Sequence, residues 1–525
     1  MSTRAVSRPA PRQTDHPRLR LAFAGAVAVG AALAIGELLA GVLPDVPSPL
    51  LAVARFVVDI QPPGAKDFIV GIFGEADKLA FQVFIVLAGL AIGAALGLLS
   101  PRRPGLAGGI LAAFTGAGFA ASLRDPNVSP ALSAAAAGIE AIAGIWLLRR
   151  LVVITTSPDA SGTAGMPDWT RRSLIRTGGA IAVGSVVLGS VGRLLLERQR
   201  APATPADVPA APVPATLPSG ADLATADLSQ EGLTPIVVPN DRFYRIDTAF
   251  IPPSVDRDTW TLRVHGMVDR EVTLTYGELV ALPIIEQYVT IACVSNTVGG
   301  NLVGNAKWTG VRLRDVLDMA GVQANADQLV GQSVDDFTAG MPVQWVMDPA
   351  RTPMIAVAMN DAPLAREHGY PARLIVPGLY GYVSATKWLA SLQLTRFDQF
   401  EGFWVPLGWA QKAPILTQSR IDVPRDGANV AAGHVAIAGV AWAPDRGISK
   451  VELRIDGGEW AQAKLSTPIS KATWVQWLYD WDAPAGSHTI EVRATDGTGD
   501  VQTDQHSNPP PDGARGHHTI GVSVS

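Results

Sequence analysis

The sequence of 525 residues is too long for one hydrophobic core and therefore predicts several domains. Hydrophobic residues make up 48% of the chain and charged residues only 17%, which is typical of a membrane segment joined to globular domains. The formal net charge is −5 and no long basic run follows the N-terminal tail, so a nucleic-acid-binding protein is not expected. A single cysteine excludes an intrachain disulfide bond.

The first 200 residues contain five apolar segments that predict transmembrane helices. They lie near 21–43, 79–99, 105–123, 131–148 and 177–196. Each is about long enough to span a bilayer core of ~30 Å. We therefore expect residues 1–200 to form a multi-pass membrane region of about five helices.

The arginines of this region predict its orientation. They gather in the N-terminal tail, in the turn at 100–104 and in the loop at 149–176. The positive-inside rule puts these three segments in the cytoplasm, so everything after about residue 200 is expected on the extracytoplasmic side of the plasma membrane. The stretch 46–76 is interrupted by DIQPPGAKD and is expected to be interfacial or re-entrant, because a sixth span would reverse the topology.

The start of the fifth apolar segment resembles a twin-arginine export signal. TRRSLIR at 170–176 is followed by the Gly/Ala-rich, modestly apolar TGGAIAVGSVVLGSVG. The alternative is that the paired arginines only anchor the end of a helix. The twin-arginine route carries folded proteins, which a domain needs if a cofactor is inserted into it in the cytoplasm.

Two further features bear on what the helices do. No histidine occurs between residues 17 and 264, so the helices lack the two ligands of a bis-histidine haem. Glu37 and Glu140 lie within apolar segments, where an ionisable side chain is costly and suggests a function. They support a hypothesis in which the helices are a transport or electron-input module; the alternative is that each lies near an interface or pairs with a neighbouring helix.

The rest of the chain predicts a linker and two globular domains. Residues 201–235 are rich in Pro and Ala and read as an extended linker. Residues 236–412 mix strand patterns, such as TWTLRVHGMV and QYVTIAC, with a short helix that Thr275 opens, which predicts an α+β domain. Residues 413–525 contain strand and turn patterns only, which predicts an all-β, immunoglobulin-like sandwich.

Cys293 is the candidate for chemistry in the α+β domain. A lone cysteine is most often a small buried apolar residue, but this one ends a strand pattern and precedes the turn residues VSNTVGGN. Histidines near it are scattered, so neither a nucleophilic cysteine nor a zinc site has a matching signature. A single thiolate suits a soft metal whose other ligands come from an organic cofactor.

The motifs around Cys293 resemble those of the sulfite oxidase family of molybdenum enzymes. FYRID (243–247), followed by PP (252–253), resembles the strand with which family members contact the pterin. TIACVSN (290–296) resembles the metal-cysteine loop, and WTGVRLRDVL (308–317) the segment packed behind it. REHGYPARLIVPGLYGYVSATKWL (366–389) is the most specific match. The resemblance covers about 236–525, and the C-terminal sandwich resembles the family's dimerisation domain.

The resemblance implies a cofactor of molybdenum with molybdopterin and Cys293 as the protein ligand of the metal. It implies catalytic roles for Cys293, Arg245 and Asp247. Arg373 would grip the cofactor phosphate bidentately and Lys387 would add a point charge. The residues that it implies for cofactor binding are Phe243, Tyr244, Arg245, Asn296, His368, Arg373, Ala385, Thr386 and Lys387.

Three departures from the family pattern bear on the substrate. Thr297 and Val298 replace an arginine pair after the metal cysteine, Asp247 replaces a histidine, and Phe400 stands where a tyrosine near the metal is expected. An aspartate repels a doubly charged anion. The site is therefore expected to be less basic than a sulfite site, with Trp404 and Trp409 either lining it or lying in the core.

These residues predict a membrane-anchored enzyme that transfers an oxo group to or from a small molecule other than sulfite, such as a sulfoxide or an N-oxide. The sequence has no haem-binding pattern, so we expect a separate electron partner, either a quinone-linked membrane protein or a cytochrome. The sandwich favours a homodimer. The alternative is a non-catalytic membrane-anchored binding or scaffold protein that retains the fold, and bound molybdenum with redox activity would distinguish the two.

Overall fold

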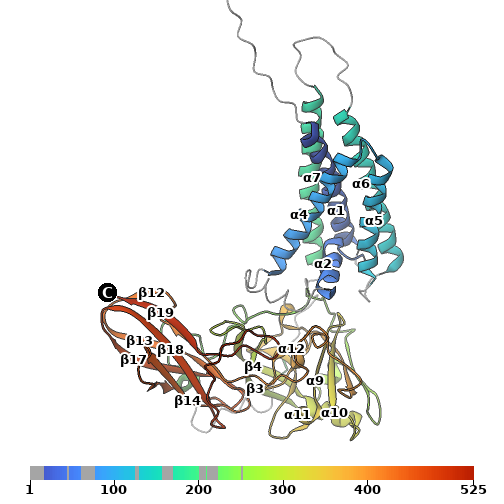
Figure 1. The fold of residues 1–525 in the computed structure, drawn as a ribbon. Coiled ribbons are helices and arrows are strands. Elements are labelled where there is room, and N and C mark those ends of the chain that lie inside the picture. The colour runs from blue at the N-terminus through green and yellow to red at the C-terminus, as the bar shows by residue number, and fades with distance from the viewer. Residues whose placement is uncertain are drawn as a thin grey trace, which may run out of the picture. The chain divides into compact units, whose positions relative to one another are not determined.

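The computed structural model describes residues 17–43, 46–60, 77–123, 129–156, 169–199, 208–209, 223–249 and 252–525. They form two compact units (Figure 1). The helical unit is drawn from residues 1–61 and 72–201, and the second unit holds residues 202–525. Arg4, Arg8 and Arg12 of the N-terminal tail and most of the expected linker lie outside the described residues, whereas Arg18 and Arg20 belong to the first helix.

The helical unit contains the predicted membrane helices. Its helices are α1 Pro17–Val42, α2 Pro49–Ile60, α4 Asp77–Leu99, α5 Pro104–Ser122, α6 Pro130–Thr156 and α7 Trp169–Gln199. Proline begins α1, α2, α5 and α6, where its missing N–H is not needed and its φ suits the first turn. Among the described residues, five of these helices are long and apolar enough to cross a membrane, as predicted, and α2 is not one of them. Helix α2 lies within the interrupted stretch 46–76, and the rest of that stretch after α2, residues 61–76, lies outside the described residues.

Helix α1 is the centre of this bundle and packs against α4, α6 and α7 (Figure 1). Its apolar window is 56% buried, whereas those of the other spans are 11 to 28% buried. Glycines permit the close packing, because a Cβ at Gly25 would lie 2.0 Å from the carbonyl oxygen of Gly93 and a Cβ at Gly41 would lie 2.2 Å from that of Gly192. Small residues at such crossings are typical of membrane helices.

The N-terminal part of the second unit is the α+β domain that the sequence predicts. Its strands are β1 Thr261–Gly266, β2 Val272–Thr275, β3 Ile284–Ala292, β4 Val303–Arg312, β5 Gln328–Ser333, β6 Thr338–Pro342, β7 Met354–Met359, β8 Ala362–Pro363, β9 Arg373–Ile375 and β10 Leu389–Thr395. Its helices are α8 Leu223–Ala226, α9 Tyr276–Val280, α10 Leu313–Ala320, α11 Val343–Met347, the 3-10 helix η2 Arg366–His368 and α12 Gly381–Ser384.

These strands form two sheets, one in the order β2-β1-β10-β5-β6 and one in the order β3-β4-β7-β8 with β9 paired to β7. Local sequence explains the short helices between them. Thr275 caps α9 as predicted, because its hydroxyl accepts from the backbone N–H of Glu278 while the Glu278 carboxylate accepts from the N–H of Thr275. Helix α10 buries Leu313, Val316 and Leu317, which share one helical face.

The C-terminal part is the predicted β-sandwich. Its strands are β11 Gln418–Val423, β12 Ala428–Val430, β13 Gly433–Trp442, β14 Ile448–Ile455, β15 Ala461–Gln462, β16 Lys464–Leu465, β17 Val475–Ala483, β18 Gly486–Asp496 and β19 His518–Val524. One sheet has the order β11-β13-β17-β16 and the other β12-β19-β18-β14-β15. Alternate residues of these strands, such as Ile490, Val492 and Ala494 of β18, are fully buried in the core between the sheets.

The end of the expected linker packs against the second unit. Ala226 of the linker and Ile236, the residue that follows the linker, are buried in the main core of this unit. Gln476 of β17 holds this segment at two places, because its side chain accepts from the N–H of Leu228 at 2.7 Å and donates to the carbonyl of Thr234 at 2.8 Å. This stretch is thus fixed to the sandwich rather than extended in solvent.

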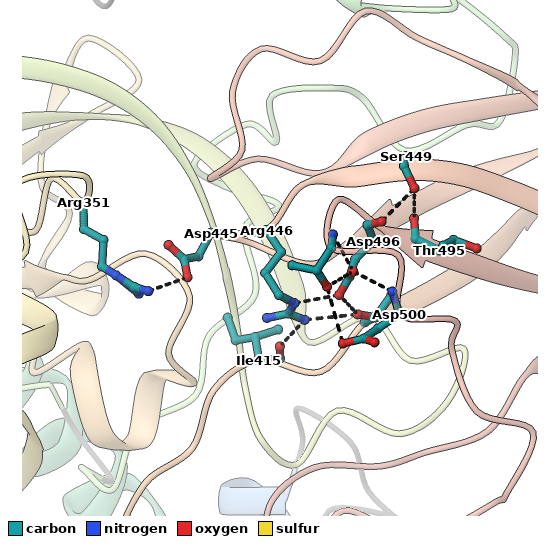
Figure 2. Close-up of polar contacts among 10 residues, drawn as sticks. Arg351, Ile415, Asp445, Arg446, Ser449, Thr495, Asp496 and Asp500 are labelled. Carbon is teal, nitrogen blue, oxygen red and sulfur yellow. Dashed lines mark hydrogen bonds and ion pairs between the residues drawn. The ribbon is translucent and has the colours of Figure 1, made fainter.

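A network of ion pairs joins the α+β part to the sandwich (Figure 2). Arg351 lies 2.8 Å from Asp445, and Arg446 donates to Asp496 at 2.7 Å and to the carbonyl of Ile415 at 3.0 Å. The Asp496 side chain is 1% exposed. Hydrogen bonds from Thr417, Thr498 and Arg446 hold the pKa of its carboxyl well below its usual value, although burial alone would raise it.

We predict that Arg446→Met destabilises the protein by about 2 kcal/mol, because a buried carboxylate loses a charged hydrogen-bond donor. Urea unfolding of the full chain in detergent, followed by tryptophan fluorescence, measures the change. Arg263→Met is the matched control, since Arg263 and Glu271 are paired at 2.8 Å with side chains that are 54% and 57% exposed, and the expected loss is under about 1 kcal/mol. Equal losses in both variants would contradict the prediction.

Candidate active site

Cys293 lies at the start of the loop between β3 and β4, where the sequence predicts it. The two strands pair from Ile284 with Val311 to Ala292 with Val303. The loop, residues 293–302, is closed by a hydrogen bond from the Cys293 N–H to the Leu302 carbonyl at 2.9 Å. The side chain of Asn296 fixes its interior, because the Asn296 Oδ1 accepts from the Leu302 N–H at 2.8 Å.

A cavity of about 830 Å³, counting the part open to solvent, lies beside this loop. It is lined by Phe243, Tyr244, Ile246, Asp247, Thr248, Ile291, Cys293, Val294, Ser295, Ser333, Asp335, Phe337, Arg373, Gly381, Tyr382, Ala385, Lys387, Trp388, Trp404 and Trp409. Most of the predicted site residues are therefore brought to one place from distant parts of the chain. A largely apolar pocket with a few convergent polar groups is the usual form of a cofactor or substrate site.

Arg373 is the buried cation of the cavity. The residue is 3% exposed, and its guanidinium carbon lies 5.0 Å from the ring centroid of Trp308. One terminal nitrogen donates to the carbonyl of His368 at 3.0 Å, whereas Nε is buried with no hydrogen-bond partner among the described residues. Burial lowers the pKa of Arg373 to about 10, so it remains charged at neutral pH.

Lys387, Asp247 and Arg245 form the charged side of the cavity. The Lys387 ammonium donates to the Asp247 carboxylate at 3.1 Å and to the carbonyl of Glu367 at 2.9 Å. Arg245 lies on the outer side, where its side chain is 40% exposed and its Nε is 3.4 Å from Asp247. Arg245 does not line the cavity itself, so it reaches the site only through Asp247.

His368 supports the cavity from behind. It is 4% exposed, its Nε2 lies 3.0 Å from the carbonyl oxygen of Asn240, and its ring meets Phe243 edge to face. Burial first, and then the charges of Lys387 and Arg373, lower the pKa of His368 to about 4, although the bond to Asn240 opposes this. The ring is therefore neutral at neutral pH.

The remaining predicted residues divide between lining and support. Ala385 lines the cavity. Thr386 does not, because its buried hydroxyl donates to the carbonyl of Gly331 at 3.3 Å. Asn296 shapes the cysteine loop, as described above. Phe400 and Val298 are not among the lining residues, whereas Trp404 and Trp409 both line the cavity and belong to the core.

The prediction of a strand at 243–247, which came from the family resemblance, is wrong. The structure has turns and irregular backbone there. Phe243 reaches the cavity because Gly304 of β4 leaves room for its ring, and a Cβ at Gly304 would lie 2.7 Å from a ring carbon. The stacked rings of Phe243 and Tyr244 lie 5.3 Å apart. Packing of aromatic rings, rather than pairing of backbone, therefore positions this segment.

Several lining residues were not predicted from the sequence. Phe337 and Asp335 follow β5, Tyr382 belongs to α12 and Trp388 precedes β10. Trp388 has φ of 49°, and its Nε1 donates to the carbonyl of Arg366 at 2.7 Å. A bulky residue with positive φ is strained, and no pattern in the sequence announces it. Burial raises the pKa of Tyr382 above its usual value, so the phenol stays protonated.

The sandwich braces the cysteine loop. Arg420 of β11 donates to the carbonyl of Gly300 at 2.8 Å and to the hydroxyl of Thr234 at 2.8 Å. His518 of β19 lies against Gly299, whose φ is 75°, and a Cβ there would lie 2.3 Å from the imidazole ring. The position and conformation of this part of the loop therefore depend on both domains of the second unit.

The donor set of the cavity fits a metal held mainly by an organic cofactor. Among the described residues, no group of three or more His, Cys, Asp or Glu side chains is placed to hold a metal ion. A single thiolate such as Cys293 suits a soft metal whose other ligands come from a non-protein group. Arg373 with its unpartnered Nε supplies positive charge that a phosphate-bearing pterin needs, and Lys387, whose charge is paired with Asp247, can add a hydrogen bond.

Comparison with known proteins indicates the same kind of cofactor. Residues 249–404 match the domain described as "Oxidoreductase molybdopterin binding domain", and residues 418–492 match "Bacterial Ig domain". Mitochondrial sulfite oxidase of Homo sapiens is 30% identical over 315 residues, which cover 51% of this chain and 57% of that protein. The oxidoreductase YuiH of Bacillus subtilis is 33% identical over 189 residues, which cover 35% of this chain and 90% of that protein.

Among solved structures, the sulfane dehydrogenase SoxCD of Paracoccus pantotrophus is similar with a TM-score of 0.49 and 23% sequence identity, over 56% of this chain and 82% of that one. The chain spans a little more than half the length of the human enzyme. The fold and the matched domains define a molybdopterin-dependent oxidoreductase joined to an immunoglobulin-like domain. The chain belongs to the sulfite oxidase family, as its motifs suggest, and its cofactor is molybdenum with molybdopterin.

The residues of the cavity have separable roles toward this cofactor. When bound, the molybdenum group supplies two-electron oxo-transfer chemistry. Cys293 would hold the metal, Arg373 and Lys387 would bind the anionic part of the pterin, and Phe243 with Tyr244 would limit access of water. Burial first, and then the negative charge of Cys293, raise the pKa of Tyr244, so its hydroxyl stays protonated and can donate into the cavity.

We predict that Cys293→Ser loses most of its molybdenum, because a hydroxyl is a poor ligand for a soft metal. The measurement is molybdenum and pterin per mole of purified full-length protein. Wild-type protein is expected to hold nearly one molybdenum per chain. Retention of the metal by a folded Cys293→Ser variant, at the wild-type level, would show that another group holds it.

A second prediction concerns acid stability. The pKa of His368 is about 6.5 in the unfolded chain and about 4 in the folded one. Its contribution, about 3 kcal/mol, is therefore complete above pH 6.5 and is lost as the pH falls toward 4. His368→Gln should flatten the pH dependence of the urea midpoint in this window, whereas the same change at solvent-exposed His434 should not. Equal slopes in both variants would exclude His368 as the cause.

Proposed function

We propose that this chain is a membrane-anchored molybdenum oxidoreductase whose catalytic domain faces the extracytoplasmic side and whose substrate is a small neutral molecule, such as a sulfoxide or an N-oxide. The observation that carries the substrate proposal is the ion pair between Asp247 and Lys387, in which the two side chains are 5% and 10% exposed. A carboxylate at this place neutralises a cation that would otherwise attract an anion.

The charge of the whole cavity supports the same substrate class. Among the described residues that line it, Arg373 and Lys387 are cations and Asp247 and Asp335 are acids, so two positive and two negative charges balance. Most other lining residues are apolar or aromatic, including Phe337, Tyr382, Trp404 and Trp409. Such a site favours a neutral substrate over the doubly charged sulfite anion.

The location rests on the helical unit. Its five apolar spans are compatible with membrane insertion, and the arginine distribution supports a cytoplasmic N-terminus. We also propose export through the twin-arginine route, because that route carries folded proteins and would allow the cofactor to be inserted before the domain crosses the membrane. The electron partner is proposed to be a quinone-linked membrane protein or a cytochrome. The immunoglobulin-like domain supports a homodimer.

We predict that the purified enzyme reduces dimethyl sulfoxide or trimethylamine N-oxide with a dye donor and oxidises sulfite poorly. Asp247→Asn should lower the KM for sulfite about tenfold or more, because removal of a carboxylate from the cavity relieves its repulsion of a doubly charged anion. Steady-state kinetics at low salt, corrected for molybdenum content, is the measurement.

Asp258→Asn is the matched control, since this carboxylate is 78% exposed and outside the cavity. It should leave the KM for sulfite unchanged. If the wild type turned over sulfite far better than either neutral substrate, the proposed substrate class would be wrong. An unchanged KM for sulfite in Asp247→Asn would contradict the proposed role of the Asp247 charge but not the proposed substrate class.

A further inference from the structure

A second cavity lies entirely within the helical unit, among α1, α2, α5 and α6. It measures about 610 Å³, counting the part open to its surroundings. Leu33 of α1, Val53 of α2 and the rings of Phe114 and Phe119 of α5 are among its apolar lining.

Two buried polar groups of α6 interrupt this apolar lining. Ser133 is 4% exposed and Glu140 is 7% exposed, and both line the cavity. The Ser133 hydroxyl oxygen has no hydrogen-bond partner among the described residues. The Glu140 carboxyl likewise makes no hydrogen bond within the part of the chain that the structure describes. A buried polar group without a partner is costly, so a ligand that bonded to both would be stabilised.

Glu37, the other acid of the bundle, is held differently. Its carboxylate accepts from the Ser48 hydroxyl at 2.6 Å and from the Leu50 N–H at 3.2 Å, and it lies 3.9 Å from Arg193. The Glu37 carboxylate is thus bonded within the bundle, in agreement with the alternative that it pairs with a neighbouring helix. Glu140 is not tied in this way. The Glu140 carboxyl fits against α1 only because residue 36 is glycine, where a Cβ would lie 2.5 Å from its Oε1.

We propose that this cavity binds the head group of a lipid-soluble quinone, with the Ser133 hydroxyl and the Glu140 carboxyl forming hydrogen bonds with its carbonyl oxygens. A quinone head group is neutral, planar and largely apolar, and its polar atoms are acceptors. It therefore matches an apolar cavity that offers two polar groups. A lipid acyl chain would leave both groups unpaired.

The position of the cavity and the redox balance of oxo transfer suit a quinone site that exchanges electrons with the catalytic reaction. This role rests on the proposed function. The cavity lies where α5 ends and α6 begins, the end of the bundle that the proposed topology puts on the extracytoplasmic side. Oxidation of a substrate by oxo transfer, with water as the oxygen source, releases two electrons and two protons. A quinone takes up both and becomes a quinol, and substrate reduction consumes both from the quinol.

The test is the binding of decylubiquinone to the full-length, molybdenum-loaded protein in detergent micelles, measured by equilibrium dialysis. Gly118→Leu is the cavity-filling variant, because Gly118 lines the cavity and a Cβ there meets no atom within 4 Å. Gly116→Leu is its control on the same helix, since a Cβ there also meets no atom within 4 Å but the residue does not line the cavity.

We expect Gly118→Leu to weaken binding at least tenfold, Ser133→Ala and Glu140→Gln to weaken it several-fold, and Gly116→Leu to leave it unchanged. Ser185→Ala is a further control, since that hydroxyl donates to the carbonyl of Ile181 in its own helix. Absence of saturable binding to the wild type, or equal weakening in both leucine variants, would overturn the proposal.

Decylbenzene, which lacks the carbonyl oxygens, separates a quinone site from a lipid site. If it binds as tightly as decylubiquinone and Ser133→Ala has no effect, the cavity is an acyl-chain site and the proposal fails. Molybdenum content and dye-linked turnover are measured on the same samples. Failure of the proposed function would abolish that turnover in the wild type, whereas failure of the quinone proposal would leave it intact.

Discussion

The antiparallel pairing of β3 with β4 is the constraint on which the catalytic region depends. It carries Cys293 to the end of a buried strand and returns the chain at once to β4, which contributes Trp308 and Gly304 to the back of the cavity. Arg373 packs over Trp308, and Phe243 packs over Gly304. One local hairpin therefore determines where the thiol, the buried guanidinium and the aromatic segment meet.

Local patterns in the sequence were sufficient to predict the features that depend only on residues near each other in the chain. The thiol at a strand end, the cap of α9 at Thr275 and the apolar spans follow from alternation, spacing and length, and the structure has them. The strand at 243–247 was expected from the family resemblance and not from a local pattern. Aromatic packing against β4 leaves the backbone of this segment without strand pairing.

Contacts between distant residues could not be found in this way. Asp247 and Lys387 are separated by 140 positions, and only the folded chain shows that they neutralise each other. Glu37 and Glu140 looked alike in the sequence, since both are acids in apolar helices. The structure separates them, because Ser48 donates a hydrogen bond to the first and Arg193 lies 3.9 Å from it, while the second faces a cavity. The partners of a buried charge are a tertiary property that spacing does not encode.

The brace between the sandwich and the cysteine loop bears on how this architecture can change. Arg420 and His518 of the sandwich contact Gly300 and Gly299 of the loop that carries Cys293. The immunoglobulin-like region is therefore not an interchangeable cassette, even though such domains occur as free-standing modules. Gene fusions or exchanges that replace it would have to bring a matching arginine and imidazole, so the two regions are expected to be inherited as one piece.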